Sequence, residues 1–226
     1  MTEFAPDDLS HIYQHRFSTN AVHEARNRLW KTLCEHWMQR YVPTDATVLD
    51  LAAGYCEFIN NIHAAHKIAV DLNEDVRQFA HPDVNIVIAW SHDMHEVEDA
   101  SVDVVFVSNF FEHLPNKQAL IDTLREIRRI LRVGGKLLIL QPNIRFLNGE
   151  YWDFIDHFLP LTDRTLVEAM EMVDMQVDEL KPRFLPYTTR SRMPQSSILV
   201  RLYLAMPLAH VLLGKQAWMV ASKPSA

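Results

Sequence analysis

Short apolar runs alternate with amphipathic segments along most of this chain. Val22, Ala25, Leu29 and Leu33 recur at helical spacing, so they predict an N-terminal helix that ends near Tyr41. Beyond this helix the pattern changes, because the apolar runs become short and continuous. Runs of that kind are typical of strands that are buried on both faces.

Five apolar runs follow residue 46, and segments with helical patterning separate them. We expect helices over 57–66, 74–80 and 117–132. The alternation predicts a doubly wound, mostly parallel sheet with right-handed crossovers, whose ligand site lies outside the carboxyl ends of the strands. The five predicted strands are TVLDLA (47–52), KIAVDL (67–72), NIVIAW (85–90), VDVVFVSN (102–109) and KLLILQPN (136–143).

The C-terminal part extends the same pattern after an aromatic, loop-rich interruption. A helix is expected to begin near Thr162, and two strand-like runs, 175–185 and 215–222, bracket a helical region over 198–214 that we expect to be buried or partly buried. The prediction is therefore one Rossmann-like α/β domain with a seven-stranded sheet. It comprises an N-terminal helical cap (1–45), a core (46–143) and a segment of loop, helices and final strands (144–226).

Composition and charge argue against several classes of protein. The chain has 226 residues, 48% hydrophobic and 23% charged, and a formal net charge of −7, which argues against a broad nucleic-acid surface. Cys34 and Cys56 offer no disulfide framework. The N-terminus has no secretory signal, and the most apolar stretch, 198–214, is too short to span a bilayer. We expect a cytoplasmic protein without a transmembrane segment.

Two acids stand where the first two predicted strands end. Asp50 lies in VLDLAAGYCEF, before a turn of small residues that lets a ligand approach the backbone. Asp71 follows 21 positions later in AVDLN, where a carboxylate can accept hydrogen bonds from both ribose hydroxyls of an adenosine moiety. A dinucleotide site is the weaker alternative, because the G-x-G-x-x-G fingerprint is absent.

These motifs resemble those of class I S-adenosylmethionine-dependent methyltransferases of the type 11 kind. The resemblance is close over 47–143, and it implies S-adenosylmethionine as the cofactor and S-adenosylhomocysteine as the product. It rests on four ordered motifs: VLDLAAGYCEF, AVDLN, SVDVVFVSNFFEHLP and LRVGGKLLILQPN.

The resemblance also implies cofactor-binding roles for the first two motifs. Asp50 and the backbone around Ala52 and Gly54 would hold the amino acid end of the cofactor. Asp71 would bind the ribose, and Leu72 would pack beside the adenine.

The third and fourth strands would supply the remaining cofactor contacts. The adenine edge would be recognised by Asp93 with Met94, or by Ser91 with His92, and we favour Asp93. Asn109, at the end of the fourth strand, would contact the methionine portion.

Two of the three glycines in the family's first motif are replaced in this chain. Ala52 and Cys56 stand in their places, and only Gly54 is retained. Alanine costs little at position 52 if its φ angle is negative. The replacements leave open a non-catalytic binding protein descended from methyltransferases.

Candidate catalytic residues are His113 and His157, either of which can serve as a general base for a hydroxyl acceptor. The ordinary alternatives are a backbone hydrogen bond for His113 and loop ordering for His157. Asp156 can orient an imidazole, recognise a cationic substrate or be a plain exposed acid. The HxxH pairs at 63/66 and 92/95 have no evident third ligand, so no metal site is expected.

We therefore expect a methyltransferase that acts on an O, N or carboxylate acceptor of a small molecule, sugar or natural product, with 144–226 on the acceptor side. An RNA or protein methyltransferase is the alternative enzyme, although no nucleic-acid partner is expected. Peripheral membrane contact through 198–213 is a further option. Tyr13, Arg16 and Phe17 are candidates for a mobile cap. The sequence does not specify an oligomeric state.

Overall fold

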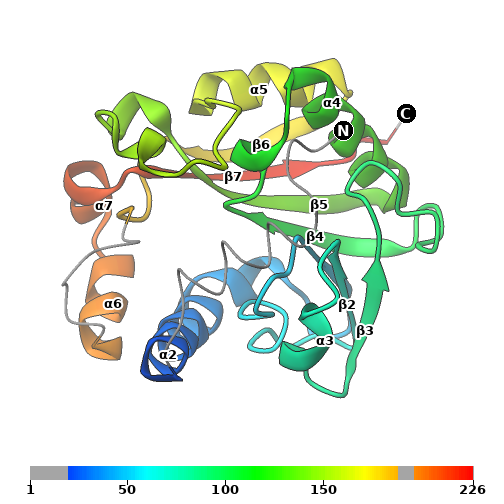
Figure 1. Cartoon of the computed structure of the whole chain (residues 1–226), viewed down its shortest axis with the longest axis horizontal. Coiled ribbons are helices and arrows are strands. Elements are labelled where there is room, and N and C mark those ends of the chain that lie inside the picture. Colours follow the sequence, from blue (N-terminus) through cyan, green and yellow to red (C-terminus); the bar gives the residue numbers. More distant parts are fainter. Residues whose placement is uncertain (1–19, 188–195, 226) are drawn as a thin grey trace.

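A mixed sheet runs through the middle of the molecule (Figure 1). The computed structural model describes residues 20–187 and 196–225, so the predicted cap residues Tyr13, Arg16 and Phe17 lie outside the described part. Within it, seven strands are ordered β3-β2-β1-β4-β5-β7-β6, and β7 is antiparallel to both of its neighbours while the other pairs are parallel. The predicted Rossmann-like sheet is confirmed. Its strands are β1 (Thr47–Leu51), β2 (His66–Asp71), β3 (Val84–Ile88), β4 (Val102–Ser108), β5 (Leu131–Pro142), β6 (Gln176–Lys181) and β7 (Gln216–Ser222).

Helices cover both faces of this sheet. Helices α4 (Lys117–Ile130) and α5 (Asp163–Met172) lie on one face, and α2 (Asn20–His36), α3 (Val76–Phe79) and α6 (Ser197–Leu204) lie on the other (Figure 1). Successive strand residues point to opposite faces. Leu49 accordingly packs in the core beneath α4 and α5, whereas Val48 packs in the core beneath α2.

The segment after β1 is not the helix that its pattern predicts. Residues 54–61 form hydrogen-bonded turns, and β2 begins at His66. Asn61 explains part of the difference, because its side-chain amide donates to the Glu57 carbonyl, 2.8 Å away, which a helix would pair with the Asn61 backbone N–H. That N–H donates instead to Phe58. Helix α3 is likewise shorter than expected, and α4 matches its prediction to within two residues at the C-terminal end.

The C-terminal segment completes the sheet as predicted. Thr162 caps α5, with its side chain accepting a hydrogen bond from the Thr165 amide, and β6 and β7 form one end of the sheet. The helical region over 198–214 consists of α6 and α7 (Pro207–Leu213). In the described part of the chain, short 3-10 helices lie in the connections: η1 (Met38–Tyr41), η2 (Phe111–His113), η3 (Ile144–Phe146) and η4 (Glu150–Asp153).

The prediction that 198–214 is buried or partly buried is wrong for most of its apolar side chains. Leu208 is 76% exposed and Leu212 is 73% exposed. The two helices are short, and only a few of their residues face the core, among them Leu204 and His210. Across residues 20–187 and 196–225, every helix is too short or too polar to cross a membrane.

The strand order places a natural binding edge at the centre of the sheet. From β1 the chain proceeds outward to β2 and β3, and then returns to β4 on the other side of β1. The two central strands are parallel, with Leu51 opposite Val107, so their carboxyl ends meet at one edge. Ligands of open α/β sheets bind outside such an edge, at the point where the strand order reverses.

Candidate active site

The turn after β1 has an unusual backbone. Ala52, Gly54 and Cys56 all adopt the left-handed conformation, with φ angles of 57°, 51° and 57°. A side chain makes that conformation unfavourable by about 1–2 kcal/mol per residue, and glycine avoids the cost. The condition that alanine costs little at position 52 is therefore not met, since its φ angle is positive.

Tertiary contacts hold this turn in place. The Ala53 amide donates to the carbonyl of Val70 on β2, at 3.2 Å, and the Cys56 amide donates back to Ala53, at 2.8 Å. The Cys56 side chain is fully buried, and its thiol lies 3.9 Å from the carbonyl of Val76 on α3. The strained turn is thus tied to the second strand and to the helix that follows it.

Asp71 is the polar link between the turn and β2. One of its carboxylate oxygens accepts the Gly54 amide at 2.8 Å, and the other accepts the Asn73 amide at 2.9 Å. Burial raises the pKa of Asp71, while these amide hydrogen bonds lower it. Leu72, the next residue, is half-buried. The two predicted cofactor positions Gly54 and Asp71 are in direct contact.

Asp50 is a second buried acid beside this link. It is 4% exposed, and burial raises its pKa well above the ordinary value. A backbone hydrogen bond from Ile59 opposes the shift, whereas the negative charges of Asp71 and Glu57 add to it. Glu57 itself pairs with Arg26, at 2.6 Å and 2.7 Å. Two carboxylates under this turn create a local preference for positive charge and for hydrogen-bond donors.

The loop after β3 makes its contacts away from these two acids. The Met94 amide donates to Glu126 on α4 at 2.7 Å, and the Met94 side chain is buried. The Asp93 carboxylate is exposed and lies 3.3 Å from the His95 ring. Ser91, the alternative, is buried, and its hydroxyl bonds to that of Thr123 at 2.8 Å.

Asn109 ends β4 in a left-handed conformation, with φ 48°, which asparagine adopts more readily than most residues. Its amide donates to Leu140 on β5 at 2.9 Å, and its side chain donates to Ser108 at 2.8 Å. The chain turns there into η2, which carries Glu112 and His113. This short helix begins directly beyond the carboxyl end of β4.

A distant segment docks on η2 and brings His157 to it. The carbonyl of Glu112 accepts the amides of Phe158 and Leu159, at 2.8 Å and 3.1 Å. The Tyr151 hydroxyl donates to the Leu159 carbonyl and so orders the same loop. As a result, the rings of His113 and His157 lie 5.0 Å apart, centroid to centroid.

Backbone carbonyls define the tautomers of these two histidines. Nδ1 of His113 lies 2.8 Å from the Asp156 carbonyl, and Nδ1 of His157 lies 2.7 Å from the Tyr151 carbonyl. A carbonyl oxygen only accepts, so each Nδ1 carries a proton and, in the neutral ring, Nε2 carries the lone pair. The backbone hydrogen bond considered for His113 is confirmed. Asp156 is 1% exposed and lies 3.3 Å from His113 Nδ1, so it is an orienting acid rather than an exposed one.

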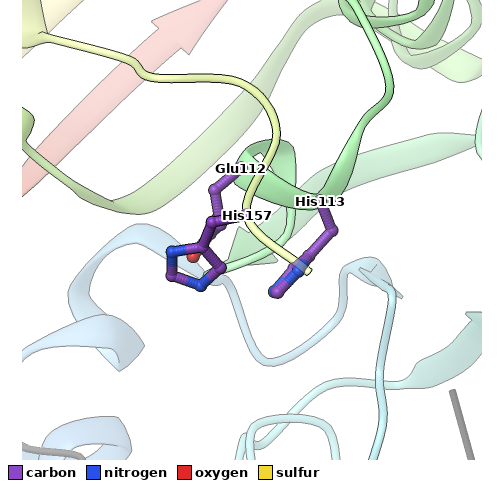
Figure 2. Close-up of side chains that lie close together, drawn as sticks. All are labelled: Glu112, His113 and His157. Carbon is purple, nitrogen blue, oxygen red and sulfur yellow. The ribbon is translucent and has the colours of Figure 1, made fainter. Parts of the chain in front are cut away.

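Glu112 is the member of this cluster that sequence reasoning missed (Figure 2). It is 1% exposed, and its carboxylate accepts the side-chain amide of Gln141 at 2.9 Å. Burial raises its pKa, and the neighbouring charge of His113 opposes that shift. The sequence held one signal for Glu112, which was its position. It is an acid next to the candidate His113, directly after a predicted buried strand.

Comparison with known proteins identifies the core. Residues 49–139 match the family model described as a methyltransferase domain. Residues 49–139 of this chain are a methyltransferase domain. The matched segment runs from β1 to β5, and it contains the left-handed turn, Asp71 and η2.

Solved structures share the fold of this methyltransferase domain at low sequence identity. A SAM-dependent methyltransferase from Archaeoglobus fulgidus is 20% identical with a TM-score of 0.64, covering 95% of this chain and 99% of its own. A chain in the complex of the Haloferax volcanii Trm112 methyltransferase activator with a methyltransferase is 17% identical, with a TM-score of 0.61 and coverages of 86% and 92%. The [4+2]-cyclase SpnF is 16% identical, with a TM-score of 0.60 and coverages of 88% and 81%. None of the curated proteins matches the sequence significantly.

The residues at the carboxyl edge fit S-adenosylmethionine, the cofactor of this domain. A Cβ built on Gly54 would meet no atom within 4 Å, so open space lies in front of the turn. An ionised carboxylate offers about four lone-pair sites, and the amides of Gly54, Asn73 and Leu72 leave part of that capacity at Asp71, so a ribose hydroxyl can still donate to it. The buried Asp50 is a suitable neighbour for a cationic group.

Replacing Ala52 by glycine should stabilise the protein. Ala52→Gly removes the left-handed penalty but adds freedom to the unfolded chain, so the free energy of unfolding should rise by about 0.5–1 kcal/mol. Ala53→Gly is the control, because Ala53 is not in the left-handed region, and it should lower stability by about 0.4–1 kcal/mol. Urea unfolding measures the free energy of unfolding of both variants. Equal losses of stability in Ala52→Gly and Ala53→Gly would contradict strain at Ala52.

Proposed function

We propose that this methyltransferase binds S-adenosylmethionine on the turn after β1 and moves its methyl group to a small-molecule acceptor beside His113 and His157. The observation that carries the proposal is the contact of Gly54 with Asp71, in a left-handed turn one strand away from the histidine pair. When bound, the cofactor supplies an electrophilic methyl group on a positively charged sulfur.

The first two strands hold the cofactor in this proposal. Asp50 and the backbone from Ala52 to Gly54 bind its amino acid end, because a buried carboxylate favours an ammonium group there. Asp71 accepts the ribose hydroxyls, and Leu72 packs beside the adenine. Both acids are already in place, so binding requires little rearrangement.

The next two strands complete the cofactor site. Asp93 recognises the adenine edge through its exposed carboxylate. The backbone amide of Met94, which was expected to join it, already donates to Glu126, so the Asp93 carboxylate makes this contact without it. Asn109 contacts the methionine portion from the end of β4.

The acceptor lies over η2, and its class is a small molecule, a sugar or a natural product with an O, N or carboxylate acceptor atom. Aromatic rings line this side, since Phe154 stacks on His157 with centroids 4.9 Å apart. Exclusion of water by such rings favours transfer from a cationic sulfur. A cytoplasmic location is part of the proposal, supported by the two free, buried cysteines.

In this arrangement, His113 and His157 are the candidate general bases for an acceptor hydroxyl. Their protonated Nδ1 atoms are held by carbonyls, so each neutral ring has its lone pair on Nε2. His113 keeps a side-chain exposure of 18%, which gives solvent and substrate access to the pair. A positioned lone pair can take the acceptor proton as the oxygen attacks the methyl carbon.

Loss of the Asp71 carboxylate should abolish cofactor binding. Asp71→Ala removes the acceptor for the ribose hydroxyls and for the Gly54 amide, so calorimetric titration with S-adenosylhomocysteine should show at least a 100-fold weaker affinity, about 2.7 kcal/mol. Asp83→Ala is the control, because Asp83 is an exposed acid next to the amino end of β3. Unchanged affinity in Asp71→Ala would refute the cofactor site, and NAD should bind to neither variant.

Removal of either histidine lone pair should slow methyl transfer without weakening cofactor binding. Asparagine keeps a donor near the position of Nδ1 and lacks Nε2, so His113→Asn and His157→Asn preserve the carbonyl bonds. With a hydroxyl acceptor found by screening labelled methyl transfer, each kcat should fall about 10²- to 10⁴-fold. His66→Asn, an exposed histidine at the amino end of β2, should keep the wild-type rate. Full activity in both cluster variants would exclude these residues from catalysis.

We also propose that α6 and α7 bring the protein to a membrane surface that holds an apolar acceptor. Seven large apolar side chains on these helices support it, because each is at least half exposed. Arg201, on α6, is exposed beside them. The seven are Ile198, Leu199, Leu202, Leu208, Val211, Leu212 and Leu213.

Vesicle sedimentation tests this surface. Wild-type protein should co-sediment with vesicles that contain anionic lipid, and Leu208→Ser with Leu212→Ser should remain in the supernatant, because two large apolar contacts are lost. Met172→Ser is the control, since Met172 is 61% exposed on α5, which covers the opposite face of the sheet. Wild-type protein that stays in solution at physiological salt would remove the membrane proposal.

A further inference from the structure

The side chains of Glu112, His113 and His157, which meet at η2, are residue types that bind metal ions. Glu112, His113 and His157 each offer one ligand atom, and these atoms lie within 4.8 Å of one another (Figure 2). Ligands bound to one ion at about 2.1 Å are up to about 4.2 Å apart, so a small movement of the side chains closes the set. Within the described residues this is the one such group of three, and neither HxxH pair forms another.

The surroundings of the histidines are those of metal ligands. Histidines that bind metals usually donate their other ring N–H to a carbonyl or carboxylate, which sets the tautomer and the ring orientation. His113 does so with the Asp156 carbonyl and lies 3.3 Å from the Asp156 carboxylate, and His157 does so with the Tyr151 carbonyl. In the neutral rings the lone pair therefore lies on Nε2, the nitrogen opposite the one that the carbonyl holds.

Glu112 and Gln141 supply two further observations. Glu112 is 1% exposed, and no lysine or arginine in the described part of the chain forms an ion pair with it. A buried carboxylate is costly without a compensating positive charge. Gln141 donates to Glu112, and its own side-chain oxygen is buried without a hydrogen-bond partner. Water or a hydroxyl on a bound ion is a donor that such an oxygen can accept.

We propose that Glu112, His113 and His157 bind one divalent transition-metal ion, such as Zn²⁺, Mn²⁺ or Co²⁺. Two imidazoles and one carboxylate are a ligand set that these ions favour, and three protein ligands leave at least one coordination position open. This inference rests on the proposed function for its acceptor, which it narrows to a hydroxyl compound that binds at the open position.

The ion has a defined task in the transfer. Coordination lowers the pKa of a bound hydroxyl, so the oxygen becomes a better nucleophile at neutral pH. The hydroxyl proton passes to water, the acceptor oxygen forms its bond to the methyl carbon, and the sulfur keeps the electron pair of the broken carbon–sulfur bond. With the ion bound, the two histidines are its ligands and do not take the proton themselves, so in this inference the ion replaces the general base of the proposed function.

Metal binding by the purified chain tests the inference directly. Protein stripped with a chelator should take up one Zn²⁺ or Co²⁺ ion per chain in calorimetric titration. Glu112→Gln, His113→Asn and His157→Asn should each weaken that binding at least 10-fold, and His92→Asn, an exposed histidine, should not. No uptake by the wild type, or equal affinity in cluster and control variants, would overturn the proposal.

Two further measurements test the metal site if the variants fail to fold and separate it from the proposed cofactor site. If the cluster variants fail to fold, X-ray absorption of the Zn²⁺-loaded wild type should show two imidazole ligands, and a spectrum without imidazole would overturn the site. Titration of the metal-free protein with S-adenosylhomocysteine separates the two proposals. Cofactor binding without metal uptake refutes this inference alone, and metal uptake without cofactor binding refutes the proposed cofactor site alone.

Discussion

The hydrogen bond between the Gly54 amide and the Asp71 carboxylate is the interaction on which the binding edge depends. It joins the turn after β1 to the end of β2, and it does so across a turn in which three residues are left-handed. Strain of this kind persists only where the surrounding contacts over-determine the backbone. The amide of Ala53 on Val70 and the burial of Cys56 supply those contacts, so an alanine and a cysteine can occupy positions that usually require glycine.

A second constraint shapes the opposite side of the edge. The Glu112 carbonyl holds the segment around His157, and carbonyls of that segment in turn hold the rings of His113 and His157. These bonds are mutual, because η2 positions the loop and the loop orients a histidine of η2. Two imidazoles with defined tautomers and a buried carboxylate result from this packing, and they lie one strand away from the left-handed turn after β1.

The family match covers only part of the two clusters at this edge. It extends over 49–139, which includes Gly54, Asp71 and η2, and His157 lies outside it. The same fold occurs in the [4+2]-cyclase SpnF, so the fold does not by itself define the reaction. Outside the matched residues lie His157 and the exposed helices α6 and α7.

The sequence alone determined the strands, their mostly parallel arrangement and the places of Asp50 and Asp71, because apolar periodicity and strand-end acids are local signals. Tertiary structure decided the rest. Positive φ at Ala52 comes from contacts with β2, and the turns after β1 replace a helix because Asn61 takes the Glu57 carbonyl. Exposure of Leu208 depends on which face of a short helix meets the core. Glu112 and His157 are 45 residues apart in the chain, and only the docking of one loop on another brings their ligand atoms together.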